Sequence, residues 1–112
     1  MAHRVCFALD LVDDADLIAA YERVHAPGAV WPEVIAGIRA KGFLDMEIWR
    51  AADRLFMIAT VAEDWPRSLT PEQGVADDRW EATMDAFQRP LPNAAATEKW
   101  APMTRIFALD DQ

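Results

Sequence analysis

A tyrosine and a histidine lie one helical turn apart in the segment YERVHAPGAVWPEV, residues 21–34 of the 112-residue chain. Tyr21 and His25 are spaced i, i+4, so both side chains lie on one face of a helix. Imidazole is the side chain whose ordinary pKa lets it give or take a proton near neutral pH. The spacing leaves two interpretations open: an acid–base site, or a histidine that only complements the helix dipole. Tyr21 taken alone is better interpreted as an interior aromatic residue with a partner for its hydroxyl.

Tryptophans are numerous for this length, with five in the chain. Indole faces pack on the C–H faces of sugars and other rings, although any single tryptophan is more often a core or interface residue. Trp80 differs because Glu81 follows it, and a flat platform beside a carboxylate suits a polyhydroxylated ligand. Glu47 lies in an apolar strand and is interpreted either as a buried, hydrogen-bonding acid or, preferably, as a residue of a dimer seam.

The composition narrows the classes of partner. Eleven Lys and Arg against 19 Asp and Glu give a net charge of −8, which argues against nucleic-acid binding. A neutral or cationic small molecule fits this charge, which solubility alone also explains. A lone cysteine, Cys6, excludes an internal disulfide and favours the cytoplasm. We expect no membrane contact, because no apolar run approaches the ~20 residues of a membrane span and the N-terminus lacks the pattern of a signal peptide.

Standard catalytic motifs are missing from the sequence. It has no glycine-rich phosphate loop, no G-x-S-x-G and no Cys/His spacing typical of zinc. We therefore expect no metal site, and any chemistry must come from side chains such as those described above.

The pattern along the chain predicts alternating strands and helices. Alternation over residues 4–11 predicts a strand, and Asp13 or Asp14 can cap a helix that ends after His25 at Pro27 and Gly28. A second helix is expected from Pro32 to Lys41, with Gly42 just past its end. Residues 43–50 and 54–62 predict a hairpin that turns at 51–53, with Phe43, Asp45, Glu47 and Trp49 on one face and Leu44, Met46 and Ile48 on the other.

The second half is less regular. Residues 63–74 are expected to form a loop, 76–89 a helix, 90–100 no regular element, and 102–109 a fourth strand. This order contains two β–α–β units, which predicts a single α+β domain over residues 1–112, a ferredoxin-like sandwich with helices on one face of the sheet. The other face is apolar and would stay bare unless a second copy covers it, so we expect a homodimer.

The segments FALDL, YERVH with WPEV, DMEIW, RLFMI, RWEATM and EKWAPMTRIFAL together resemble the L-rhamnose mutarotase family. The match runs in order over residues 4–109 and is closest to the subgroup that acts on L-fucose. The resemblance implies a dimeric α/β barrel and a cofactor-free enzyme that interconverts the α and β anomers of a deoxy-sugar. It also implies His25 as proton donor, with Tyr21 and Trp80 contacting the sugar.

The chain departs from the rhamnose enzymes of the family at two positions. Glu81 stands where they carry a second tryptophan, and Met46 where they carry a strand tyrosine, as in the fucose-type subgroup. The link APGAV, residues 26–30, is also longer than usual. These departures shift the expected substrate from L-rhamnose towards L-fucose.

Mutarotation opens a hemiacetal ring and closes it on the other face, so one group must donate a proton and another accept one. Our hypothesis is that His25 protonates the ring oxygen, while Tyr21 and a carboxylate, Glu81 ahead of Glu47, hold or deprotonate hydroxyls. Trp80 would pack on the sugar, with His25 facing a cavity that Trp31 helps to wall. Two alternatives stay open: a cofactor-free monooxygenase of the dimeric barrel type, or a non-catalytic binding protein.

Overall fold

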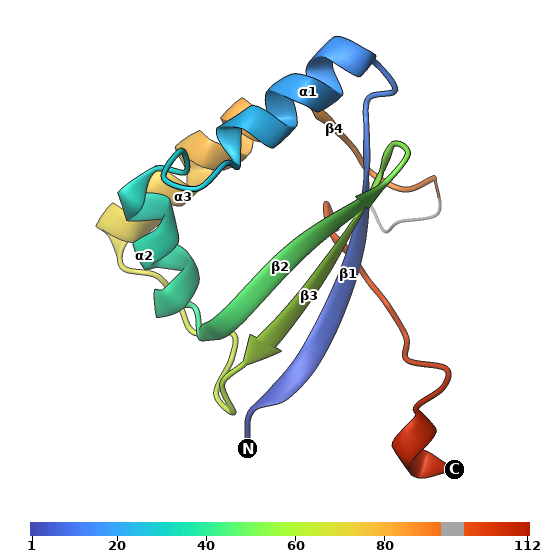
Figure 1. Ribbon diagram of the computed structural model, residues 1–112. Coiled ribbons are helices and arrows are strands. Elements are labelled where there is room, and N and C mark those ends of the chain that lie inside the picture. The colour runs from blue at the N-terminus through green and yellow to red at the C-terminus, as the bar shows by residue number, and fades with distance from the viewer. Residues whose placement is uncertain (93–97) are drawn as a thin grey trace.

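A computed structural model of the chain describes residues 1–92 and 98–112. Over these residues three helices cover one face of a curled antiparallel sheet, and the C-terminal segment runs along the other side (Figure 1). The elements in chain order are β1 His3–Leu11, α1 Ala15–Val24, α2 Pro32–Ala40, β2 Phe43–Ala51, β3 Arg54–Val61, α3 Pro71–Met84, β4 Gln88–Arg89, β5 Ala101–Pro102 and the 3-10 turn η1 Leu109–Asp111. The predicted α+β class is confirmed.

Local sequence signals set where the helices begin. The Asp14 carboxylate accepts a hydrogen bond from the Leu17 N–H at 2.9 Å and caps α1, as predicted. Helix α3 begins at Pro71, earlier than predicted, because Thr70 and Gln73 form a reciprocal capping box. The prediction of a loop through residue 74 was therefore wrong.

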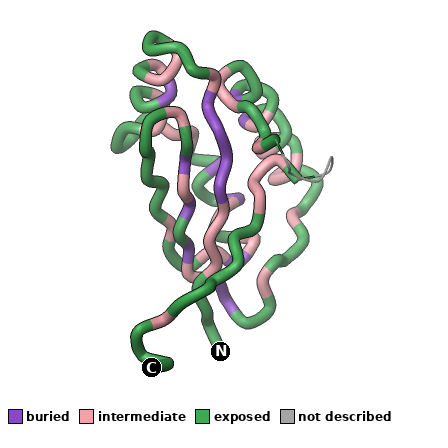
Figure 2. Tube along the Cα trace, turned by 90° about the vertical axis from the view of Figure 1, so that its right-hand side faces the viewer, coloured by how far each residue is buried: buried purple, intermediate pink, exposed green. Residues whose placement is uncertain are grey.

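The sheet has the strand order β2-β3-β1-β4, and β5 also pairs with β1. Strands β1 and β3 run antiparallel with Leu9 opposite Leu55, and both side chains are buried beneath the helices. Buried residues gather along the central strands and in short stretches of the helices (Figure 2). Burial of such leucines supplies most of the driving force for folding, and it fixes the register because a shift by one residue would expose them.

A β-bulge changes which residues of β2 face the helices. The register shifts between Phe43 and Asp45, so Phe43 lies on the same face as Met46 and Ile48. The prediction that Phe43 shares a face with Asp45 and Glu47 was therefore wrong. The bulge brings one more aromatic side chain under the helices.

The predicted strand over residues 102–109 was also wrong. Only Ala101–Pro102 pairs with β1, and beyond it the Met103 N–H donates to the Cys6 carbonyl at 2.9 Å. The edge of β1 is instead shared with β4, a strand of two residues that directly follows α3. The irregular stretch predicted over 90–100 includes residues 93–97, which lie outside the described residues. None of the described helices is long and apolar enough to span a membrane.

Candidate active site

Tyr21 and His25 stack on each other at the end of α1. Their ring centroids are 4.2 Å apart with an interplanar angle of 34°, which confirms that the i, i+4 spacing places both rings on one face. Helix α1 ends at Val24 and His25 is its C-terminal cap. Tyr21 is buried and His25 is half-buried, so burial raises the pKa of Tyr21 to about 12 and lowers the pKa of His25 below its ordinary 6.5.

A backbone contact fixes the tautomer of His25. Its Nδ1 lies 2.7 Å from the Tyr21 carbonyl oxygen, and a carbonyl can only accept, so Nδ1 carries the proton. In the neutral imidazole Nε2 then holds the free lone pair. The resting histidine is therefore a proton acceptor at Nε2, and it becomes a donor there only after it has taken a proton.

Both rings open onto a cavity of about 430 Å³ between the helices and the sheet. This volume lies within the ~300–1,000 Å³ usual for small-molecule sites. Aliphatic, aromatic and methionine side chains form most of the wall, including Ile38 from α2, Met46 from β2 and Met57 from β3. The ionisable and amide side chains that line it are Tyr21, His25, Lys41, Asp77, Glu81 and Gln88. An apolar wall with a few convergent polar groups is typical of a site for a small polyhydroxylated molecule.

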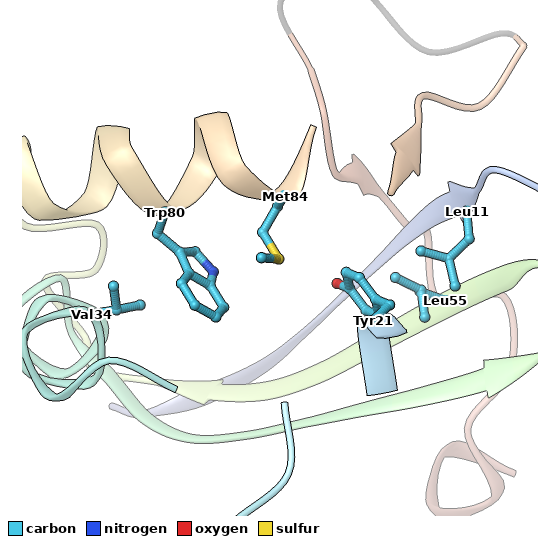
Figure 3. Close-up of a cluster of buried hydrophobic side chains, with 6 residues drawn as sticks. All are labelled: Leu11, Tyr21, Val34, Leu55, Trp80 and Met84. Carbon is cyan, nitrogen blue, oxygen red and sulfur yellow. The ribbon is translucent and has the colours of Figure 1, made fainter. Parts of the chain in front are cut away.

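Trp80 and Glu81, the two residues of α3 that the sequence singles out as candidates for sugar binding, both line this cavity. The Trp80 indole lies between α3 and the sheet, and the Tyr21 hydroxyl points towards the side of Trp80 and Met84 (Figure 3). His25 meets Trp80 edge-to-face with centroids 5.6 Å apart, and Trp31 packs on the same indole at 5.0 Å. Trp31 supports Trp80 but is absent from the residues that line the cavity, so the prediction that it walls the cavity was wrong.

Lys99 holds the Glu81 carboxylate in place. Its Nζ donates to Glu81 Oε2 at 2.6 Å and also pairs with Asp85. Burial alone would lower the pKa of Lys99, but the hydrogen bonds to Asp85 and Glu81 outweigh it and raise that pKa. The next residue, Trp100, lines the cavity. The segment just before β5 therefore provides Lys99, which holds Glu81, and Trp100, which lines the cavity.

Glu47 is the one predicted site residue that the structure does not bring to the cavity. It is exposed on the face of β2 away from the helices, while its neighbours Met46 and Ile48 line the cavity. The interpretation of Glu47 as a buried acid was wrong, because alternation along the strand points it outward. A place in a dimer seam stays a prediction.

Four residues that line or support the cavity were not predicted from the sequence: Lys41, Asp77, Gln88 and Lys99. Lys41 Nζ lies 3.2 Å from Asp77 Oδ2 at the cavity wall. Asp77 precedes Glu81 by four residues on α3, so helical spacing could have found it. The other three depend on how distant segments fold back, for which the sequence carries no local signal. Over residues 1–92 and 98–112 no group of three or more His, Cys, Asp or Glu side chains is placed to hold a metal ion.

Known proteins resemble this chain over almost its whole length. A sequence profile of the L-rhamnose mutarotase family matches residues 4–109. An L-fucose mutarotase of Xanthomonas campestris pv. campestris is 48% identical over 111 residues, covering 96% of this chain and 89% of that protein. An L-rhamnose mutarotase of Acidiphilium cryptum is 30% identical over 108 residues, covering 95% and 97%. These matches favour neither a monooxygenase nor a non-catalytic binder.

A solved structure has the same fold. The crystal structure of an L-rhamnose mutarotase from Formosa agariphila superposes with a TM-score of 0.67 over 96% of this chain and 98% of that one. The two sequences are 18% identical, so this likeness supports the fold alone. The profile match and the curated relatives supply the family: this chain belongs to the L-rhamnose mutarotase family and is a carbohydrate isomerase.

Proposed function

We propose that the protein interconverts the α and β anomers of a 6-deoxy-hexose, L-fucose in preference to L-rhamnose, without a cofactor. The stacked Tyr21–His25 pair, opening onto a cavity of about 430 Å³, is the observation that carries the proposal. Glu81 and Met46 line the cavity at the two positions where the chain resembles the fucose-type subgroup. The 48% identity to an L-fucose mutarotase supports the same preference.

His25 is the proposed catalytic residue. Its Nε2 takes the proton of the anomeric hydroxyl as the ring opens and returns it when the ring closes on the other face. This role differs from the hypothesis drawn from the sequence, in which His25 protonates the ring oxygen, because Nδ1 carries the proton of the neutral imidazole and Nε2 can then only accept. A positioned base of this kind contributes ~10²–10⁴-fold. The Glu81 carboxylate accepts hydrogen bonds from sugar hydroxyls, and Trp80 packs on the C–H face.

Anomer exchange measured by NMR tests this function directly. Magnetisation transfer between the two anomeric protons is recorded for L-fucose and for L-rhamnose, with and without the protein. We expect faster exchange for both sugars and a larger acceleration for L-fucose. Background exchange with both sugars would refute the proposal, and a larger effect on L-rhamnose would reverse the preference.

The pH dependence of the catalysed exchange follows from the two pKa shifts. Burial lowers the pKa of His25 below 6.5, so the neutral, accepting form dominates at neutral pH. This form is lost when the pH falls through the lowered pKa. Tyr21 keeps its proton to about pH 12. We expect kcat/KM, corrected for background, to lose activity only below pH 6.5 and to stay level up to pH 9. An optimum centred below pH 5 would contradict a neutral His25.

The uncovered face of the sheet supports a homodimer that forms a dimeric barrel. Trp49 and Ile58 lie on this face and are 61% and 37% exposed. Beyond β5 the C-terminal segment exposes Ile106 and Phe107 by 95% and 64%. The radius of gyration is 14.8 Å, where a compact chain of this length has about 13 Å. Apolar side chains on an extended segment beside a bare sheet are what a second copy would cover.

A charge on this face should dissociate the dimer. We expect the wild-type protein to show twice the chain mass of 12.6 kDa in sedimentation, and Ile58→Asp to show the mass of one chain. A buried aspartate without a partner opposes association. Val75→Asp, at a 59% exposed position on α3, is the matched control and should stay dimeric. A wild-type protein that sediments as one chain would remove the dimer from the proposal.

A further inference from the structure

The side-chain amide of Gln88 is only half satisfied at the cavity wall. Its Nε2 donates to the Tyr21 hydroxyl oxygen at 3.2 Å, while its Oε1 is buried and has no partner among the described residues. Strand β4 places this amide, because Gln88 pairs with Leu11 and the preceding Phe87 carbonyl accepts from the Val12 N–H at 2.8 Å.

This contact determines where the Tyr21 proton points. An amide nitrogen can only donate, so the tyrosine oxygen uses a lone pair towards Gln88 and its own O–H must turn elsewhere. Within the described residues no acceptor is bonded to that O–H. Figure 3 shows the Tyr21 oxygen directed to the side of Trp80, where the cavity lies.

We propose that Gln88 is a positioning residue that makes Tyr21 the proton donor of the reaction, by donating to the tyrosine oxygen and so leaving its O–H free to point at the ring oxygen of the sugar. The inference rests on the proposed function and names the partner of His25. Glu81 is less suited to be the proton donor, because its carboxylate is paired with the Lys99 ammonium and accepts hydrogen bonds.

The proton transfers balance without any further reagent. His25 Nε2 takes the proton from the anomeric hydroxyl, the anomeric carbon forms a carbonyl, and the bond from that carbon to the ring oxygen breaks. The electron pair stays on the ring oxygen, which takes the proton of Tyr21. The tyrosinate is stabilised by the Gln88 N–H and by the imidazolium stacked 4.2 Å away. After rotation of the aldehyde, the same protons return and the ring closes on the other face.

Two substitutions test the direction of this hydrogen bond. Gln88→Met removes the donor at similar volume, and Gln88→Glu replaces it at pH 8 with an acceptor that pulls the Tyr21 proton away from the cavity. The bond from Gln88 strengthens when Tyr21 becomes a charged tyrosinate, so its loss should slow the reaction. We expect kcat for L-fucose to fall about tenfold in Gln88→Met and about 100-fold in Gln88→Glu. We expect KM to change less than threefold, because the bond matters most when the tyrosinate forms. A merely structural role for Gln88 would lower the thermal unfolding midpoint and leave kcat of the folded variant unchanged.

Gln73→Glu is the matched control, since it makes the same chemical change in α3 at the capping-box position, where glutamate serves equally well. It should keep the wild-type kcat. A spectroscopic readout is also available because Tyr21 is the only tyrosine, so a ¹³Cζ-tyrosine label gives one resonance. L-Fucose should shift this resonance in the wild type as the O–H gains an acceptor.

The outcomes separate the two proposals. A wild-type protein that accelerates neither sugar overturns the proposed function and this inference with it. An active wild type together with a fully active Gln88→Glu overturns only this inference, and shows that the amide presents its oxygen to Tyr21. An unshifted ¹³Cζ resonance in an active wild type saturated with L-fucose likewise removes Tyr21 as the donor.

Discussion

Replacing His25 with alanine should lower the catalysed anomer exchange by about 10²–10⁴-fold while the chain still folds. Imidazole is a side chain whose ordinary proton affinity suits transfer near neutral pH, and the Nε2 of His25 is left free by the bond from Nδ1 to the Tyr21 carbonyl. Without it the anomeric proton must leave to water, as in the uncatalysed reaction. Magnetisation transfer with L-fucose, at equal concentrations of folded protein, measures the loss.

The catalytic effect of His25→Ala must be distinguished from a structural one, because alanine also leaves the Tyr21 carbonyl without its hydrogen-bond partner. His25→Asn keeps an amide that can donate to this carbonyl and suits a helix C-terminus, yet it cannot exchange protons at neutral pH. We expect the same loss of rate with a thermal unfolding midpoint near that of the wild type. His3→Ala removes the only other histidine, which is exposed, and should change nothing. If His25→Asn kept a rate within threefold of the wild type, His25 would not be the base.

The part of the site that follows from local periodicity could be predicted from the sequence. Tyr21 and His25 share a face because they are one turn apart, and Trp80 directly precedes Glu81 on a segment that the sequence predicts to be a helix. Both predictions concern neighbours within one element. They need only the geometry of a helix and no knowledge of how the elements pack.

The remaining features depend on contacts between distant segments. Lys99 reaches Glu81 because β5 returns the chain to β1, and Gln88 reaches Tyr21 because β4 turns back directly after α3. The bulge at the start of β2 inverted the expected face of Phe43, since one extra residue breaks the two-residue period. Thr70 and Gln73 were a readable capping box, but the prolines around them favoured a loop.

Trp80 should prove indispensable to the fold as well as to the site. Its side chain is 8% exposed and belongs to the buried cluster that includes Tyr21, Val34 and Met84. We expect Trp80→Ala to lower the free energy of unfolding by about 3–5 kcal/mol, because truncation of a buried aromatic loses its transfer energy and leaves a cavity. The unfolding midpoint would fall on the order of 15 °C, measurable by circular dichroism.

Because the Trp80 indole both packs in the core and faces the proposed sugar site, a smaller substitution is needed to separate the two roles. Trp80→Phe keeps an aromatic ring in the cluster and should cost less than half as much stability, while the smaller ring leaves a gap in the wall on which the sugar packs. We therefore expect a folded variant with a raised KM for L-fucose and a kcat near that of the wild type, since His25 and Tyr21 remain. Val75→Ala, at an exposed position of the same helix, should shift stability by less than about 0.5 kcal/mol. Wild-type stability of Trp80→Ala would contradict the packed core, and a wild-type KM in Trp80→Phe would place the sugar away from this indole.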